Sequence, residues 1–132
     1  MKLKMTQEER MLLIKDLSAR LPYAVTVEHT SGFRGTLHDI TVHHMYDNND
    51  NIYDAVCYTD FFGDKDAIYI EYFKPYLFPL SSMTEEERIA IGNEFAYGQP
   101  HKAMDILHKR HIDYRGLIEK GLAINATGKN VY

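Results

Sequence analysis

Five residues near the C-terminal end of the sequence could take part in chemistry. His108 and His111 stand three positions apart, and Asp113, Tyr114 and Arg115 follow directly. Two histidines with this spacing on a helix can bind one metal ion, because residues three positions apart share a helix face. Zinc requires further ligands, and the sequence has no His-Glu-x-x-His pattern. A metal-dependent enzyme built on His108 and His111 is therefore the third of three hypotheses.

The same two histidines also have a structural interpretation. On a helix, His108 and His111 continue an apolar stripe that begins at Met104 and Leu107. Asp113 is a favoured residue for capping the next short helix, because its carboxylate accepts hydrogen bonds from free backbone amides. We therefore interpret this segment mainly as the joint that packs the C-terminal helices onto a sheet.

A second candidate metal site lies in the polar segment 47–51. Asp47, Asn49 and Asn51 place oxygen ligands at alternating positions, as a calcium loop does. The glycine and the distal glutamate of such a loop are missing, because Ile52 and Tyr58 occupy their positions. We interpret this segment as a polar turn.

Nucleophiles and phosphate-binding loops are scarce in this sequence. Cys57 is the single cysteine, which excludes a disulfide within the chain and a cysteine-based zinc site. It lies in an apolar run, where a buried small residue is expected and not a reactive thiolate. The eight glycines are scattered and form no phosphate-binding loop. We expect no cofactor and no enzymatic activity.

Charge is distributed unevenly along the chain. The formal net charge of −4 gives no general attraction to nucleic acid or to an anionic membrane. Residues 45–71 contain seven acidic residues and one lysine, in a chain with ten tyrosines. An acidic surface rich in tyrosine suits a basic protein partner, because tyrosine is favoured in interfaces. The leading hypothesis is a protein-binding face made of Tyr58, Asp60, Asp64, Asp66 and Tyr69.

Nucleic-acid binding by the C-terminal region is the second hypothesis. Residues 101–120 contain five basic residues, three acidic residues and three histidines. The candidate phosphate contacts are Lys102, Lys109, Arg110 and Arg115. Against this hypothesis, the aromatic residues that could stack on bases lie mainly in the acidic part of the chain, where phosphates are repelled.

The pattern of elements predicts one α+β domain. A chain of 132 residues is long enough for a single core. Helical and strand patterns occur in separate runs, which is typical of α+β folds and not of alternating α/β folds. The expected regions are a helix at 7–20, a sheet at 22–73, a connector at 74–83, a helical region at 84–122 and a tail at 123–132.

Local signals define these elements. Capping boxes at Thr6–Glu9 and Thr84–Glu87 predict helices at 7–20 and 85–96. Further helices are expected at 100–111 and at 115–120, with Gly121 as a left-handed cap. The sheet is expected to have four to five antiparallel strands, the clearest at 67–73. A sheet of this size can be open, or it can curl into a small SH3-like barrel, and the sequence leaves both alternatives. The apolar alternation changes phase near His38–Asp39, which predicts a bulge. We expect an irregular connector and a frayed tail.

Two blocks of the sequence resemble a known family. KPYLFPLSSMTEEE (74–87) and HIDYRGLIEKGLA (111–123) resemble blocks in a family of small uncharacterised proteins, encoded mainly by phages and mobile elements of gut anaerobes. LPYAV (21–25) is similar to a third segment of that family. The resemblance implies a phage or mobile-element origin and carries no catalytic residues. We therefore expect a non-catalytic accessory protein that binds a macromolecular partner, such as a host protein.

The sequence gives no sign of membrane insertion. The opening MKLKMTQEER lacks the apolar run of a signal peptide. No segment reaches the roughly 18 consecutive apolar residues of a membrane-spanning helix. We expect a cytoplasmic protein, in a host cell if it is phage-encoded.

Overall fold

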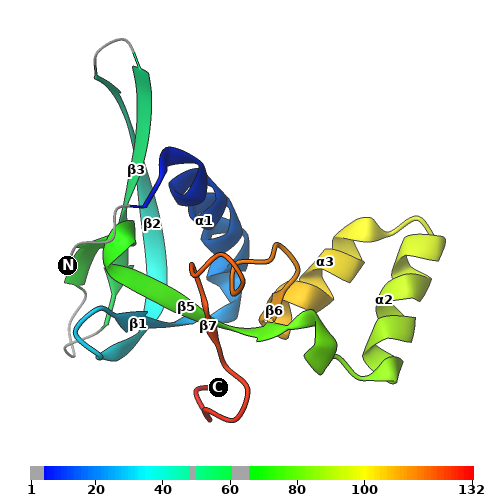
Figure 1. The fold of residues 1–132 in the computed structure, drawn as a ribbon. Coiled ribbons are helices and arrows are strands. Elements are labelled where there is room, and N and C mark those ends of the chain that lie inside the picture. Colours follow the sequence, from blue (N-terminus) through cyan, green and yellow to red (C-terminus); the bar gives the residue numbers. More distant parts are fainter. Residues whose placement is uncertain (1–4, 48–49, 61–65) are drawn as a thin grey trace. The chain divides into compact units, whose positions relative to one another are not determined.

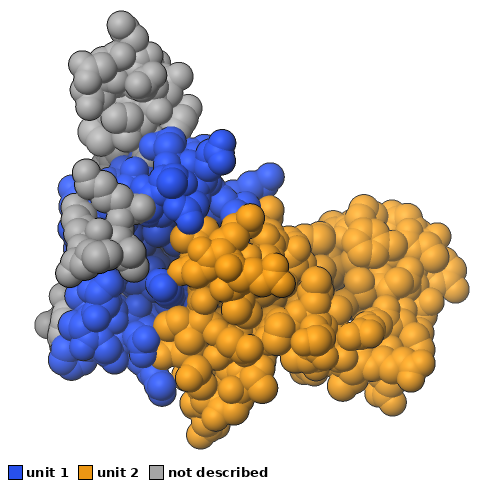
Figure 2. Space-filling model, viewed as in Figure 1, with its two compact units in different colours: residues 1–75 blue, residues 76–132 orange. Residues whose placement is uncertain are grey.

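The computed structural model describes residues 5–47, 50–60 and 66–132, apart from the side chains of 43–53 and 66. The chain divides into two units, residues 1–75 and 76–132 (Figure 2). The α+β prediction is confirmed: an N-terminal helix precedes an open mixed sheet that does not close into a barrel, and helices follow (Figure 1). The expectation of a single folding domain stays a prediction.

Among the described residues, no helix combines the length and apolarity that crossing a membrane requires.

Helix α1 (Gln7–Arg20) starts and ends where the sequence predicted. Its capping box is present: the Thr6 hydroxyl accepts the Glu9 amide at 3.1 Å, and the Glu9 carboxylate accepts the Thr6 amide at 2.9 Å. Leu13 and Leu17 lie on the side that contacts β2 and β3, and both are fully buried. The capping box therefore sets the position of the helix start, and the apolar stripe determines which side faces the sheet.

The sheet of the N-terminal unit is antiparallel. Its strands are β1 (Thr26–His29), β2 (Arg34–Asp47), β3 (Asp50–Thr59), β4 (Asp66–Tyr69) and the first part of β5 (Phe73–Pro79). They pair in the order β4–β3–β2–β1–β5. The predicted bulge is confirmed, because the pairing of β2 with β3 shifts register between Leu37 and Asp39. The bulge places both Leu37 and Ile40 opposite buried residues of β3.

Two predictions about this part of the chain need correction. The polar turn expected at 47–51 is narrower than predicted, since β2 runs to Asp47, β3 begins at Asp50 and these two residues pair; residues 48 and 49 lie outside the described residues. The strand expected at 67–73 is interrupted by a 3-10 turn, η2 (Ile70–Tyr72). The interruption has a packing reason: Ile70 and Phe73 are three positions apart and both are buried, which a straight strand does not allow.

The connector expected at 74–83 is also regular structure. Strand β5 continues to Pro79, and a 3-10 turn, η3 (Leu80–Ser82), follows. Pro75 pairs with Val27 of β1, although the sequence pattern treats proline as a strand breaker. Tyr76 and Leu77 of this segment are almost completely buried.

The C-terminal unit packs two helices against short strands. Helix α2 (Glu85–Ala96) matches its prediction, and α3 (Pro100–Lys109) follows it. The second part of β5 pairs in parallel with β6 (Ile112–Asp113) and β7 (Ile124–Asn125). The helices share a core made of Ile91, Ala103, Leu107 and Ile112, with Phe78, Met83 and Met104 packed against it.

The last part of the chain departs from the sequence predictions. Helix α3 ends at Lys109 and not at residue 111, because His111 has a left-handed backbone (φ 56°). The helix expected at 115–120 is a single turn. Gly121 (φ 75°) closes that turn as predicted, and the Leu122 amide donates to the Leu117 carbonyl at 2.9 Å.

The tail expected to be frayed is packed instead. Ala126 is almost completely buried, and its amide donates to the Leu77 carbonyl at 2.8 Å. The Tyr132 hydroxyl donates to the Tyr76 carbonyl at 2.6 Å. Small polar and glycine residues suggested disorder, but backbone pairing with β5 fixes this segment.

A buried ion pair lies on the side of α1 that faces the core. The Arg20 guanidinium contacts both carboxylate oxygens of Asp16, at 2.8 and 3.2 Å, and both side chains are completely buried. Removing two charges from water costs free energy that their attraction repays only in good geometry. Loss of one partner is therefore much more damaging than replacement of both.

We predict that Asp16→Ala lowers the free energy of unfolding by about 3–5 kcal/mol, because the buried guanidinium loses its carboxylate. Urea denaturation measures this change. The double variant Asp16→Leu/Arg20→Met should lose less, since no unpaired charge remains. Lys15→Ala, an exposed change on the same helix, is the matched control and should stay within about 0.5 kcal/mol of wild type. Equal losses in Asp16→Ala and the double variant would contradict this account.

Candidate functional site

One face of the sheet formed by β2, β3 and β4 is open. Two cross-strand rows make this face, which we name the tyrosine face: Asp39–Tyr58–Ala67 and Thr41–Val56–Tyr69. None of the six residues is buried, and Tyr69 is 51% exposed. The alternate residues of β3, Ala55, Cys57 and Thr59, are fully buried. The sheet therefore has one core face and one face available for contacts.

The structure brings together part of the acidic face predicted from the sequence. Tyr58 and Tyr69 lie on the tyrosine face in neighbouring rows. Asp60 comes two residues after Tyr58, and its side chain is 41% exposed. Asp64 lies outside the described residues. The backbone of Asp66 pairs with Thr59, and its side chain is also outside the description.

Hydrogen bonding holds Asp60 in place beside the tyrosine face. One carboxylate oxygen accepts the Thr36 amide at 2.5 Å. The other lies 3.7 Å from Nε2 of His38. Asp60 therefore links the end of β3 to β2 and still presents negative charge at the surface.

Other acidic residues of the 45–71 stretch are engaged with α1. Arg10 lies 3.6 Å from the Asp54 carboxylate and 3.3 Å from the Glu71 carboxylate. These two carboxylates stabilise the position of the helix and contribute less charge to the surface. The sequence hypothesis missed Asp39, which lies outside that stretch. Asp39 follows the predicted bulge and stands two positions before Thr41, so strand alternation places both residues on the same face. That alternation is the sequence signal that could have identified Asp39.

Cys57 is a buried thiol, as the sequence predicted. It is fully buried in β3. Burial, with a smaller contribution from the Asp54 carboxylate, raises the pKa of its thiol from the ordinary 9.0 to about 12. A thiol with this pKa forms almost no thiolate at neutral pH and is a poor nucleophile.

The two candidate metal-ligand histidines point to different partners. Nε2 of His108 lies 2.5 Å from the Tyr114 hydroxyl, which also accepts a hydrogen bond from Arg115 at 3.2 Å. The Arg115 guanidinium lies 4.9 Å from the centre of the Tyr114 ring. The His111 ring stacks instead on Tyr132, with 3.8 Å between ring centres. These contacts join the end of α3 to the segments that follow.

Among residues 5–47, 50–60 and 66–132, no group of three or more histidine, cysteine or acidic side chains could hold an ion. The side chains of the calcium-like segment 47–51 lie outside the described residues.

Asp113 has the capping role predicted for it. Its two carboxylate oxygens accept the amides of Leu117 and Ile118, each at 2.9 Å, and the residue is 5% exposed. The capped element is one turn and not a full helix. Two amides, one buried and one partly buried, thus depend on a single carboxylate.

The four basic residues predicted to contact the phosphates of nucleic acid have different surroundings. Lys102 is exposed on α3, and Arg115 is engaged with Tyr114. Lys109 and Arg110 line the same hollow of the C-terminal unit. Arg110 donates to the Glu87 carboxylate at 2.6 Å, and this hydrogen bond is the main cause that lowers the Glu87 pKa. The sequence could not reveal the hollow, because its lining comes from distant segments.

Comparisons with known proteins supply no family for this chain: no family model, no curated protein and no solved structure matches it. The resemblance to phage-encoded proteins therefore stays a prediction. Function has to be inferred from the positions and charges of the side chains.

We predict that stability falls as pH rises from about 9 to about 12, partly because of Cys57. In this range the unfolded chain loses the thiol proton while the folded chain keeps it, so unfolding becomes more favourable. Cys57→Ala lacks this titration and should lose stability less steeply, as urea denaturation across the same pH range would show. An equal slope in the two proteins would contradict a buried, protonated thiol.

We predict that Asp113→Ala lowers the free energy of unfolding by about 2 kcal/mol, because the Leu117 and Ile118 amides lose their acceptor. Chemical denaturation measures the loss. Glu119→Ala, an exposed change in the same turn, is the control. If both variants lost the same small amount, the carboxylate would not hold this turn.

Proposed function

We propose that this chain is a non-catalytic accessory protein that binds a basic protein surface through the tyrosine face. One observation carries the proposal: Tyr58 and Tyr69 lie in adjacent rows of an open sheet face, and Asp39 pairs directly with Tyr58. Aromatic side chains next to acidic ones are suited to lysine and arginine, because a cation can rest on the ring while a carboxylate receives its hydrogen bonds.

Strand pairing supports this proposal. It holds the backbone of the two rows at fixed spacing, so binding requires little ordering of the backbone. Tyr69 is half exposed, and Val56 and Tyr58 beside it are partly exposed. A surface with an apolar centre and acidic residues at its edge resembles the general layout of protein interfaces.

The resemblance of the KPYLFPLSSMTEEE and HIDYRGLIEKGLA blocks to phage and mobile-element proteins suggests the setting. On this proposal the partner is a basic protein of the host cell. Nucleic acid is disfavoured as a ligand of the tyrosine face, because Asp39 and Asp60 would repel phosphates.

We predict that Tyr69→Ala and Asp39→Lys each reduce capture of the partner by about tenfold or more, since each removes a central contact of the face. The tagged protein and its variants are incubated with gut-anaerobe lysate, and retained proteins are quantified by mass spectrometry. Capture should also weaken with added salt, because charge contributes to the contact.

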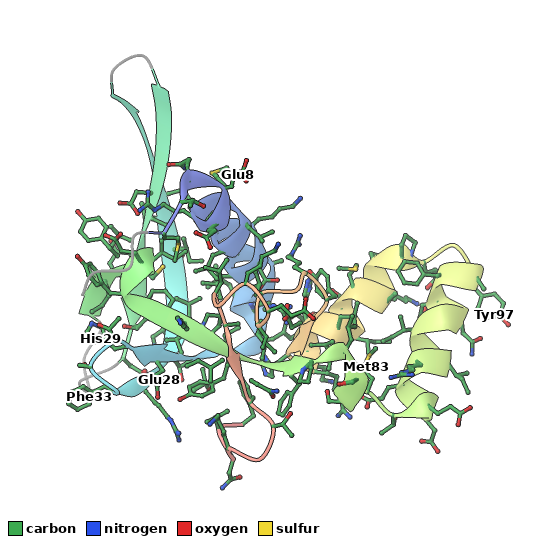
Figure 3. All side chains as sticks on the ribbon, viewed as in Figure 1. Glu8, Glu28, His29, Phe33, Met83 and Tyr97 are labelled. Carbon is green, nitrogen blue, oxygen red and sulfur yellow. The ribbon has the colours of Figure 1, made fainter. Side chains whose placement is uncertain are left out.

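Two exposed changes in the unit 76–132 serve as controls: Tyr97→Ala, at the end of α2 (Figure 3), and Glu119→Lys. Both should leave capture unchanged, and melting temperatures should show that all four variants fold. The proposal fails if the face variants capture the same protein as well as wild type does. It also fails if the retained material is removed by nuclease.

A further inference from the structure

A hollow of about 540 Å³ lies within the C-terminal unit. Its walls come from β5, the start of α2, the end of α3 and the tail. This volume falls within the roughly 300–1,000 Å³ typical of small-molecule sites. The hollow belongs to a different unit from the tyrosine face, so it can be considered independently of the proposed function.

One wall of the hollow is aromatic. The rings of Phe78 and Tyr132 lie 6.0 Å apart, and His111 stacks on Tyr132 at an interplanar angle of 11°. The hydrogen bond from Tyr132 to the Tyr76 carbonyl holds this ring in place. Tyr132 is 44% exposed, which leaves part of its surface available to a planar group.

The backbone at His111 is in a costly conformation. Its φ of 56° is uncommon for a residue with a side chain. The amide of His111 donates to the His108 carbonyl at 3.0 Å, and its carbonyl accepts the Phe78 amide at 2.8 Å. These bonds hold a turn that directs the imidazole against Tyr132. Strain of this kind occurs preferentially at ligand sites.

The rim of the hollow carries positive charge. Lys109 and Arg110 both line it and both are exposed. Arg110 forms an ion pair with Glu87, which is also in the lining. The hollow therefore combines a planar wall, two cations and one carboxylate, and Thr127 adds a hydroxyl group.

We propose that this hollow binds a small anionic ligand with a planar ring, the chemistry of a nucleoside monophosphate. The ring lies against the wall of Phe78 and Tyr132, and the phosphate meets Lys109 and Arg110. Glu87 accepts a hydrogen bond from an amino or hydroxyl group of the ligand. A free nucleotide and the end of a nucleic acid strand share this chemistry.

The test is titration of the isotope-labelled full chain, followed by the NMR shifts of its amides. The probes are adenosine monophosphate, adenosine, inorganic phosphate and a 5′-phosphorylated oligonucleotide. Adenosine monophosphate should shift the amides of residues 109–112 and 127–128. Lys109→Glu should weaken its binding by about tenfold, because a charged hydrogen-bond donor is lost. Lys120→Glu, exposed and outside the lining, should leave binding unchanged.

Variants of Tyr132 distinguish the contribution of the ligand's ring to binding from that of its phosphate. Tyr132→Leu should weaken binding of adenosine and its monophosphate but not of inorganic phosphate. Tyr132→Phe keeps the ring and loses the hydrogen bond to the Tyr76 carbonyl, so it should bind the two adenosine ligands more tightly than Tyr132→Leu does. Tighter binding of the oligonucleotide at the same amides would support the proposal and assign the ligand to nucleic acid ends. No shifts at millimolar monophosphate, or equal affinity for inorganic phosphate and the monophosphate, would overturn it.

Discussion

The architecture of the N-terminal unit depends on one constraint: within residues 5–47, 50–60 and 66–75, a single α-helix is available to cover the sheet. Strand side chains alternate between two faces, so a helix on one face leaves the other in contact with water. Helix α1 contacts β2 and β3, and Ala55 and Cys57 on one face of β3 are fully buried, whereas Tyr58 and Tyr69 on the alternate face are not. The tyrosine face is exposed because one helix can cover only one of the two faces of the sheet.

Polar contacts then determine how the helix lies on the sheet. Arg10 reaches carboxylates on β3 and η2, and the buried pair of Asp16 and Arg20 lies among the apolar residues of α1. The Asp16–Arg20 pair lies within α1 and moves with the helix, whereas the Arg10 ion pairs join the helix to β3 and η2. We interpret the Arg10 contacts as the reason that the helix has one orientation on the sheet.

Local signals predicted local structure well. Capping boxes located α1 and α2, the phase change near residue 38 located the bulge, and Asp113 and Gly121 were assigned their capping roles correctly. Features set by distant contacts were not predictable. The turn at Ile70–Tyr72 exists because Ile70 and Phe73 must both be buried, and the tail is ordered by pairing with β5.

The sequence likewise predicted some residues of the candidate site and missed those that distant contacts determine. Composition indicated Tyr58, Asp60 and Tyr69, but it could not show that Arg10 engages Asp54 and Glu71, or that Asp39 joins the face across the bulge.

The most direct measurement of the central claim is site-specific photo-crosslinking in host cells. A crosslinking residue at position 69 should give one discrete protein adduct, and the same residue at the exposed position 97 should give none. Adducts at 97 without any at 69 would contradict the account.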